Sequence, residues 1–303
     1  MNLRDLQYIV AVAEEGHFGH ASERCNVSQP ALSGQIKKLE DSLGVKIFER
    51  TNRRVSVTPV GAEIVQHAKR LLLIADEIEA TAAAAADPLA GRLRFGTIPT
   101  IGPYLWPEIL RPLKAALPKV DLTLTEDVTE NLERRLCSGE IDAAVTATVP
   151  EENGIAEISL YHEPFVVALP TGHALDTGKP IDVTKIDSSE MLLLRDGHCL
   201  SDQVAKLCGI GRKRTSREVD TRASSLETII GLVAAGAGVT LLPASALGLD
   251  GRVRAGISIA QASNKAAARK VRLIYRETYP KAELMKAVID VIAKHLPPGV
   301  AAA

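Results

Sequence analysis

The first 44 residues show apolar stripes separated by polar breaks at the spacing of short helices. Residues 3–15 form one amphipathic stripe that ends at Gly16, and residues 18–25 fit a second, shorter helix. A third helix opens at Ser28, has Pro30 in its first turn and ends at Gly44. The apolar positions are Leu3, Leu6, Ile9, Val10 and Ala13 in the first helix and Leu32, Ile36, Leu39 and Leu43 in the third. The short turn at residues 26 and 27 gives the last two helices the spacing of a helix-turn-helix, in which the second helix reads a DNA major groove.

A long helix is predicted directly after this segment. Thr58 is a suitable N-cap with Pro59 in the first helical position, and no strong helix breaker follows until Asp87-Pro88. An a/d-like seam runs along it, interrupted at Glu79, through Val65, Ala68, Leu72, Ala75 and Ala82. Such a seam favours either pairing between two subunits or packing of the helix on its own domain.

From Gly91 onward, strand patterns alternate with helix patterns. Strands are predicted at RLRFGTIPT, VDLTLTED, IDAAVTA, PFVVALP, EMLLLRD, SREVD, GVTLLP and KVRLIYR. Helices are predicted at residues 103–117, 129–138, 201–207, 224–235 and 281–295, with a capping box from Ser224 to Glu227. The alternation predicts parallel sheets of the doubly wound type, in two α/β lobes with a cleft between them. Thr100 and Thr129 follow two of the strands, where their hydroxyls either line the cleft or cap helices.

The composition indicates the class of protein but does not identify its binding partner. The chain has 303 residues, of which 46% are hydrophobic and 3% aromatic, and this suits an aliphatic globular protein. Its net charge is −1, but residues 37–54 carry six basic residues against three acidic ones, a mixture that fits a solvated face as well as a DNA-binding one. No stretch approaches the roughly 18 apolar residues of a membrane span, and the first twenty residues lack a secretory signal. We therefore expect a cytoplasmic protein with no membrane partner.

Residues 18–50, FGHASERCNVSQPALSGQIKKLEDSLGVKIFER, carry a specific resemblance. This run is similar to the DNA-binding signature of the LysR-type transcriptional regulators. It departs from the signature at Ser22, where alanine is usual, and at Cys25, where leucine is usual; both residues are small enough to pack. The resemblance implies double-stranded promoter DNA as a partner, with groove contacts from Ser28, Gln29, Pro30, Ser33 and Gln35 and phosphate contacts from Arg50 and Arg53 on a wing. Each helix residue taken singly could equally be an ordinary exposed side chain.

The same resemblance implies a fold and a division of the chain. The fold class is α/β with an all-α N-terminal part. We expect a winged helix-turn-helix domain at 1–58, a dimerising linker helix at 59–88 and a regulatory domain of periplasmic-binding-protein type at 89–303. Within the regulatory domain, lobe I would comprise about 91–162 and 269–303, and lobe II about 163–268. The resemblance also implies a homodimer or homotetramer that contacts RNA polymerase.

The segment LLLRDGHCLSDQVAKLC, with IPTIGPYLWP before it and ASSLETIIGLVAAGAGVTLLP after it, resembles the peroxide-sensing OxyR branch of this family. The resemblance implies that hydrogen peroxide oxidises Cys199, that Cys208 resolves the product into a disulfide, and that the disulfide state activates antioxidant genes. A cellular disulfide reductant would return the disulfide to two free thiols. The residues that the resemblance assigns to the peroxide pocket are Thr100, Thr129, His198, Asp202, Gln203 and Arg269. It implies no cofactor, no metal and no enzymatic turnover.

Physical chemistry supports a switch at these two cysteines. Cys199 precedes a predicted helix, whose N-terminus favours a thiolate and would lower the thiol pKa. Nine residues of helix separate two Cα atoms by about 13.5 Å, whereas a disulfide tolerates about 4.4 to 6.8 Å. If residues 200–207 are helical in the reduced chain, bridging requires that helix to unwind or bend.

The sequence also allows other interpretations of the four cysteines. Cys25 and Cys137 are expected to be buried small hydrophobes. The spacing of the histidine and the cysteines is poor for zinc. A thiol peroxidase would share the reactive cysteine but gives no reason for the helix-turn-helix, and a regulator that binds a small organic anion would leave the cysteines incidental.

Overall fold

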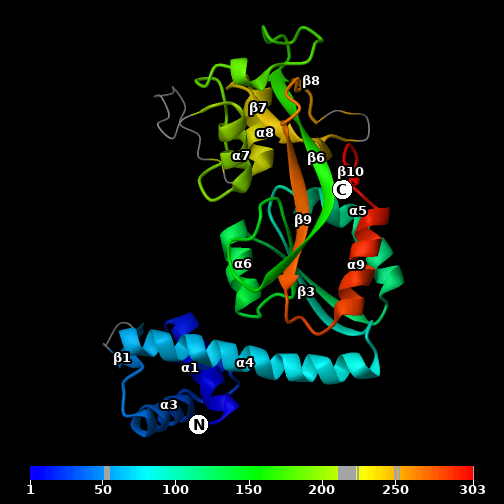
Figure 1. Cartoon of the computed structure of the whole chain (residues 1–303). Helices are drawn as coiled ribbons and strands as arrows, with labels where there is room; N and C mark the ends of the chain where they lie inside the picture. The colour runs from blue at the N-terminus through cyan, green and yellow to red at the C-terminus, as the bar shows by residue number, and fades with distance from the viewer. Residues whose placement is uncertain (51–54, 211–222, 224, 249–250, 252, 303) are drawn as a thin grey trace. The chain divides into compact units, whose positions relative to one another are not determined.

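The computed structural model describes residues 1–50, 55–210, 223, 225–248, 251 and 253–302 and divides the chain into two compact units, Met1–Ala85 and Ala86–Ala303. The first unit contains α1 (Leu3–Glu15), α2 (Phe18–Arg24), α3 (Gln29–Leu43), β1 (Phe48–Arg50), β2 (Val55–Val57) and nearly all of α4 (Pro59–Ala86). Figure 1 shows these elements in the blue and cyan part of the chain. None of the described helices has both the length and the apolar character needed to cross a membrane.

The ends of the N-terminal helices lie where the sequence predicts them. Asn2 forms a capping box with Asp5 at the start of α1, and Gly16 ends the helix in the left-handed conformation. Ser28 caps α3 by accepting a hydrogen bond from the Ala31 amide, and Gly44 ends it. The antiparallel strands β1 and β2 form the wing. The predicted helix-turn-helix and wing are therefore confirmed as local structure.

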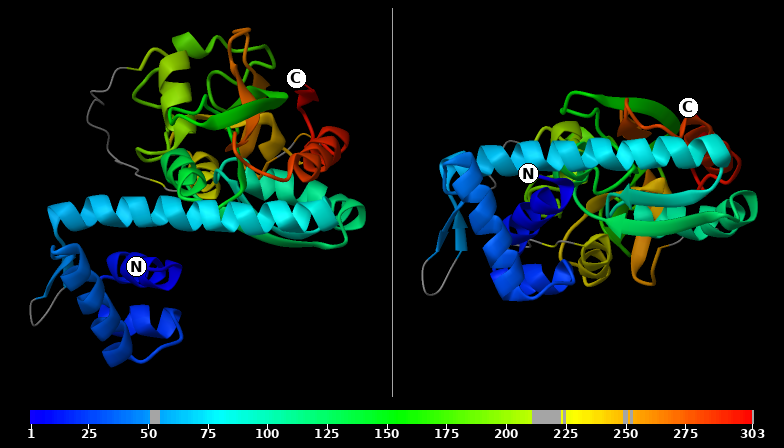
Figure 2. Two further views of the ribbon diagram at one scale, coloured as in Figure 1. Left: turned by 60° about the horizontal axis from the view of Figure 1, so that its bottom comes forward. Right: turned by 90° about the horizontal axis from the view of Figure 1, so that it is seen from below.

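Helix α4 is a single helix of 28 residues, as predicted (Figure 2). The Thr58 hydroxyl caps it by accepting from the Gly61 amide. Gly61 is required for close approach, because a Cβ there would collide with the Ile47 carbonyl at the base of the wing.

The first half of the predicted α4 seam packs on its own unit, which is one of the two outcomes that the sequence allowed. Val65 and Ala68 are buried in the core of their own unit, and Leu72 packs against that core. The helix leaves a different stripe exposed, at Leu71, Ile74 and Ile78. The sequence could not choose between the two outcomes, because the spacing of small apolar residues does not say which neighbour covers them.

The second unit is built on one mixed sheet of eight strands (Figure 1). Its elements are β3 (Gly91–Thr97), α5 (Gly102–Ala116), β4 (Val120–Glu126), α6 (Thr129–Cys137), β5 (Ala143–Thr146), β6 (Ile155–Pro170), the 3₁₀ turns η1 (Val183–Lys185) and η2 (Ala244–Ala246), α7 (Cys199–Leu207), α8 (Leu226–Ala234), β7 (Thr240–Pro243), β8 (Ile257–Gln261), β9 (Ala268–Arg276), α9 (Ala282–Lys294) and β10 (Ala301–Ala302). The order along the main path is β10-β6-β9-β5-β3-β4, and β7 and β8 pair with β6.

The sheet differs from the predicted parallel arrangement. Among the described strands, only the β3–β4 and β3–β5 pairs are parallel, whereas β9 and β6 run antiparallel to their neighbours. The 16-residue β6 is continuous: its first part pairs with β9, and its last part pairs with β7 and β8. This long strand therefore carries the chain from one hydrophobic core to the next.

Two separate apolar cores define the two lobes. One surrounds β3, α5, β5 and α9, and the other surrounds the end of β6, α7, α8 and β7. Lobe I below means the part built on the first core, and lobe II the part built on the second.

Two local predictions in lobe II were wrong. The N-cap of α8 is Ser225, one residue later than predicted, and it makes no side-chain capping bond; Ser224, the first residue of the predicted capping box, lies outside the described residues. The segment at residues 190–196 makes only isolated bridges, from Met191 to Val239 and from Leu194 to Ala223, because an apolar run that crosses a core need not form a full strand. The predicted strand at residues 216–220 lies outside the described residues.

Candidate functional site

Cys199 is the first residue of α7 and follows a tight turn. Gly197 has a φ of 93°, a conformation that a side chain would strain, and His198 precedes the helix in an extended conformation. The thiol is partly exposed and packs against the core of lobe I. The narrow pocket at this thiol, called here the thiol pocket, is lined by Ile98, Pro99, Thr100, Val128, Thr129, Gly197, His198 and Cys199. Thr100 and Thr129 thus lie beside Cys199, as the sequence predicts.

The surroundings of Cys199 act on its pKa in opposite directions. Burial raises the thiol pKa above its ordinary value, and this effect is the largest. The positive charge of Arg269, the Thr129 hydroxyl and the Leu200 amide lower it, but they do not cancel the burial. The expectation of a lowered pKa from the helix N-terminus alone is therefore wrong for this resting conformation, because the packing around the sulfur removes water that the helix end does not replace.

Arg269 connects the thiol pocket to both lobes through a buried hydrogen-bond network. Its Nε donates to Glu163 Oε2 at 2.7 Å, and its Nη1 and Nη2 donate to the Thr100 hydroxyl and carbonyl at 2.8 Å each. Glu163, which is 0% exposed, also accepts the Ser245 amide from lobe II. Glu163 and Arg269 face each other across the β6–β9 pair. The network therefore fixes Thr100 and holds a positive charge near the sulfur.

His198, Gln203 and Asp202 have three different environments. His198 is buried, and its Nε2 has no hydrogen-bond partner in the described part of the chain. Burial, with a smaller contribution from Arg195, lowers its pKa and favours the neutral ring. Gln203 donates from Nε2 to the Ala147 carbonyl at 2.8 Å and so ties α7 to lobe I. Asp202 is exposed, and neither Gln203 nor Asp202 lines the thiol pocket.

Cys208 lies at the far end of α7, in the core of lobe II. It is buried, and burial raises its pKa to about 11. Both cysteines are free, and α7 between them is intact, as the switch hypothesis requires of the reduced chain. Their Cα atoms are nine helical residues apart, about 13.5 Å at the normal rise. A bridge therefore requires α7 to bend or unwind.

The other two cysteines have less distinctive surroundings. Cys25 and Cys137 are half-buried rather than buried as expected, and burial raises the pKa of each thiol. Across the described residues, no three His, Cys, Asp or Glu side chains gather in an arrangement that could hold a metal ion.

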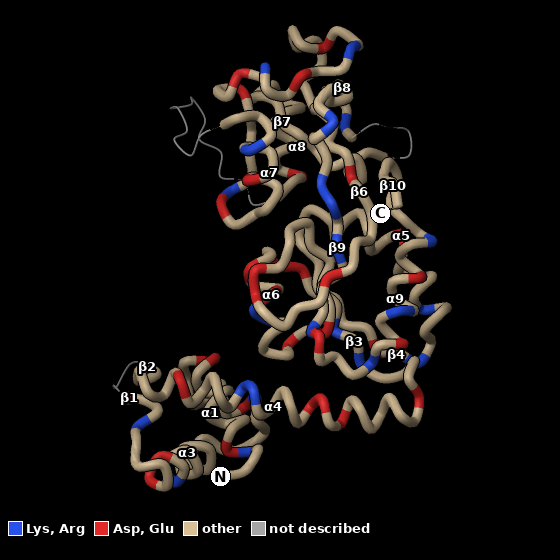
Figure 3. Tube along the Cα trace, in the orientation of Figure 1, with Lys and Arg blue, Asp and Glu red and all other residues tan. Residues whose placement is uncertain are grey.

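The start of α3 presents the side chains that the resemblance assigns to DNA. Ser28, Gln29 and Pro30 are exposed there, and Ser33 is half-buried one turn later. Gln35 donates from Nε2 to Asp5 Oδ1 at 2.9 Å, so this amide braces α3 against α1. The Arg50 side chain and Arg53 lie outside what the structure describes. Figure 3 shows lysine and arginine interspersed with acidic residues in this unit, as in the sequence.

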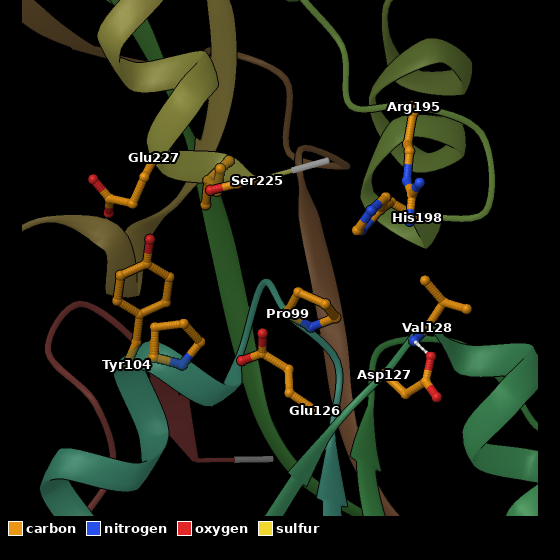
Figure 4. Close-up of a pocket in the computed structure, with 11 residues that line it drawn as sticks. Pro99, Tyr104, Glu126, Asp127, Val128, Arg195, His198, Ser225 and Glu227 are labelled. Atoms are coloured by element: carbon orange, nitrogen blue, oxygen red, sulfur yellow. Dashed lines mark hydrogen bonds between the residues drawn. The ribbon is translucent and has the colours of Figure 1, made fainter. Parts of the chain in front are cut away.

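Two groups of acidic residues were missed by sequence reasoning. Glu163 directly precedes the apolar run PFVVALP, and a carboxylate beside a buried strand is a signal that it has a charged partner. Glu126 and Asp127 end the predicted strand VDLTLTED, at the edge where ligands of α/β folds collect. With Glu227 they line a second cavity of about 280 Å³, which Figure 4 shows.

A helix-turn-helix unit with a wing, a long helix and a two-lobed α/β unit are the parts of a bacterial one-component regulator. The family comparison agrees: residues 3–62 match the bacterial regulatory helix-turn-helix protein, lysR family, and residues 86–297 match the LysR substrate binding domain. The chain therefore belongs to the LysR family, and within it to the OxyR branch, as its relatives indicate.

The relatives resemble the chain over nearly its whole length. The hydrogen peroxide-inducible genes activator of Dickeya chrysanthemi is 38% identical over 296 residues, which cover 98% of this chain and 96% of the relative. Among solved structures, full-length OxyR of Pseudomonas aeruginosa with a cysteine-to-aspartate substitution has a TM-score of 0.77 at 39% identity, covering 96% and 94% of the two chains. A hydrogen-peroxide-bound cysteine variant of Corynebacterium glutamicum OxyR has a TM-score of 0.65 at 36% identity, covering 97% and 92%.

Proposed function

We propose that this protein is a DNA-binding transcriptional regulator that senses hydrogen peroxide through Cys199. The observation that carries the proposal is the placement of two free cysteines at opposite ends of one helix, with Cys199 beside two threonine hydroxyls and Cys208 in another core. The likeness to peroxide-inducible activators supports it.

The chemistry begins with attack by the Cys199 thiolate on one peroxide oxygen. A sulfur–oxygen bond forms, the peroxide bond breaks, and the departing hydroxide takes up a proton to leave as water. The hydroxyls of Thr100 and Thr129 and the unpartnered Nε2 of His198 surround the sulfur and can bind the peroxide oxygens. Arg269 acts by fixing Thr100 and by favouring the thiolate, and Gln203 acts by holding α7 against lobe I.

The second step converts this local oxidation into a change of fold. The sulfenic acid at Cys199 condenses with the Cys208 thiol, forming a disulfide and releasing water. Because an intact α7 holds the two residues apart, condensation removes Leu200, Val204 and Cys208 from the core of lobe II. The surface around α7 then changes, and with it the contacts that this unit offers to another subunit.

The output of the switch is a changed engagement of promoter DNA. The exposed start of α3 supplies the groove-reading residues, and the exposed Leu71, Ile74 and Ile78 of α4 are spaced to pair with the same helix of a second subunit. We assign the working form as a homodimer or homotetramer in the cytoplasm, with RNA polymerase and a cellular disulfide reductant as further partners. The protein is a sensor and not an enzyme. Each chain therefore consumes one peroxide per oxidation and stays oxidised until its disulfide is reduced.

A footprinting experiment tests the proposal. The reduced chain is bound to promoter DNA, treated with one equivalent of hydrogen peroxide per chain and footprinted before and after. We expect the protected region to change in parallel with a Cys199–Cys208 disulfide found by mass mapping. A disulfide with no change of footprint would contradict a regulatory role. Rapid multiple turnover of peroxide when a thiol reductant is supplied in excess would indicate a peroxidase.

Replacing Val204 with alanine should accelerate the second step. Val204 is 1% exposed on α7 in the lobe II core, and the loss of two methyl groups weakens docking of the helix by about 1.6 kcal/mol. If α7 must leave the core before the cysteines meet, the sulfenic acid should decay to the disulfide roughly tenfold faster. Rapid quenching and mass spectrometry measure this rate.

The matched control is Lys206→Ala, at an exposed position on the same helix. Its rate of disulfide formation should stay within about twofold of the parent, because it removes no core packing. Equal rates for Val204→Ala and the parent would show that disulfide formation does not depend on undocking of α7.

A further inference from the structure

A second cavity adjoins the thiol pocket. This cavity, called here the vestibule, has a volume of about 280 Å³ and shares Pro99, Val128 and His198 with the thiol pocket. The buried His198 ring therefore stands between the two spaces, with its unpartnered Nε2. The thiol pocket itself has no room for a water-sized molecule as it stands, so a peroxide arriving from the vestibule has to displace its walls slightly.

The vestibule lies between the two lobes and is lined mainly by acidic charge. Glu126 and Asp127 come from the end of β4, and Glu227 from the first turn of α8. Figure 4 shows Tyr104 and Glu227 on one side of the cavity and Arg195 and His198 on the other. Among the described residues that line the vestibule, three carboxylates thus face one guanidinium, and the neighbouring histidine is favoured in its neutral form.

The carboxylates differ in how far they are neutralised by neighbours. Asp127 accepts hydrogen bonds from the Val128 amide and from Asn131 Nδ2, and Arg135 lies 3.9 Å away. Burial raises the pKa of Glu126, although its side chain stays exposed at the cavity. Within the described part of the chain neither Glu126 nor Glu227 has an ion-pair partner, so these two carboxylates contribute most of the field in the vestibule.

The pKa of Tyr104 responds to these charges, because its side chain lines the cavity. Its pKa is raised to about 12, first by burial and next by the charge of Glu227, with smaller contributions from Glu163 and Glu126 and an opposing one from Arg269. The contribution of Glu227 to this pKa shows that its negative charge disfavours a second negative charge within the cavity, in addition to the larger effect of burial.

We propose that the vestibule is the entrance to Cys199 and that Glu126 and Glu227 select uncharged peroxide by repelling anionic reagents. The inference rests on the proposed function, because it takes Cys199 as the reacting thiol. Hydrogen peroxide carries no charge and crosses such a field without a Coulomb penalty, whereas an anion is depleted at the entrance. The anionic class includes peroxymonosulfate, whose terminal oxygen would be transferred to the thiolate with sulfate as the leaving group.

The test compares two alkylating reagents of similar size and different charge on the reduced full-length chain. Iodoacetamide is neutral and iodoacetate is an anion, and each transfers its carbon to the thiolate sulfur with loss of iodide. The two rates are measured by mass mapping of Cys199. Their ratio isolates the entrance field, because any change in the Cys199 pKa alters both rates equally. In the double variant Glu126→Gln with Glu227→Gln, iodoacetate should gain about three- to tenfold over iodoacetamide at low salt.

Two controls identify the origin of the effect. The double variant Glu108→Gln with Glu283→Gln removes the same charge from exposed positions outside the vestibule and should leave the ratio within about twofold of the parent. In about 1 M salt, where the Debye length is about 3 Å, the gain of the vestibule variant should disappear. Hydrogen peroxide and peroxymonosulfate, compared in the same variants, should follow iodoacetamide and iodoacetate respectively.

The outcomes separate this inference from the proposed function. An unchanged alkylation ratio in the vestibule variant, or an equal change in the control variant, overturns the charge filter even if peroxide still links the two cysteines. A shifted ratio in a chain whose Cys199 peroxide fails to oxidise would leave the filter standing and remove the peroxide-sensing proposal.

Discussion

Replacing Cys199 with serine is expected to abolish the response to peroxide. A serine hydroxyl does not ionise at neutral pH and has no sulfur to oxidise, so no nucleophile remains at the start of α7 and neither a sulfenic acid nor a disulfide should form at this position. Cys208 cannot substitute, because it is buried in the lobe II core and its pKa is raised to about 11. The footprint of the variant on promoter DNA should be that of the reduced parent, with or without peroxide.

Cys137→Ser is the matched control for this prediction. Cys137 belongs to the same unit and is also a free, half-buried thiol with a raised pKa, but it does not line the thiol pocket. Its replacement should leave both the disulfide and the footprint change intact. A Cys199→Ser chain that shifted its footprint at the same peroxide concentration as the parent would refute sensing at Cys199.

Local structure could be predicted from the sequence wherever it depends on residues that are neighbours along the chain. The ends of α3 and α4 follow from Ser28, Gly44 and Thr58, whose side chains or backbones stop or start a helix by themselves. The intact α7 between the cysteines was likewise predicted from its own pattern. The placement of Thr100 and Thr129 at the Cys199 thiol was predicted from the family resemblance and not from the periodicity of the sequence.

Structural features that depend on residues far apart in the sequence could not be predicted from local patterns. Nothing within β9 states that it runs antiparallel to β5, and the alternating first half of β6 gives a weaker pattern than its apolar end. The choice between the two possible neighbours of the α4 seam was open for the same reason. The pKa of Cys199 also depends on packing, since burial around the sulfur outweighs the neighbouring charge and hydrogen bonds that favour the thiolate.

Removing Arg269 is expected to cost the second unit about 3–5 kcal/mol of unfolding free energy, as for other broken buried ion pairs. The variant Arg269→Met leaves the Glu163 carboxylate at 0% exposure without its cation, and it leaves Thr100 without two donors. Trp106, the single tryptophan of the chain, packs against the core of lobe I, so its fluorescence in a urea titration reports unfolding of this unit.

The same variant should also change the titration of Cys199. Arg269 lowers the thiol pKa, so its loss raises the folded-state pKa further, and the alkylation rate of Cys199 should rise only at a higher pH than in the parent. The double variant Glu163→Gln with Arg269→Met removes both buried charges and should recover much of the stability, because no carboxylate is left unpaired. It should not recover the pH profile, because the cation is still absent. Recovery of both properties would show that Arg269 influences the thiol only through the fold, whereas recovery of stability alone identifies the guanidinium as the charge that favours the reactive thiolate.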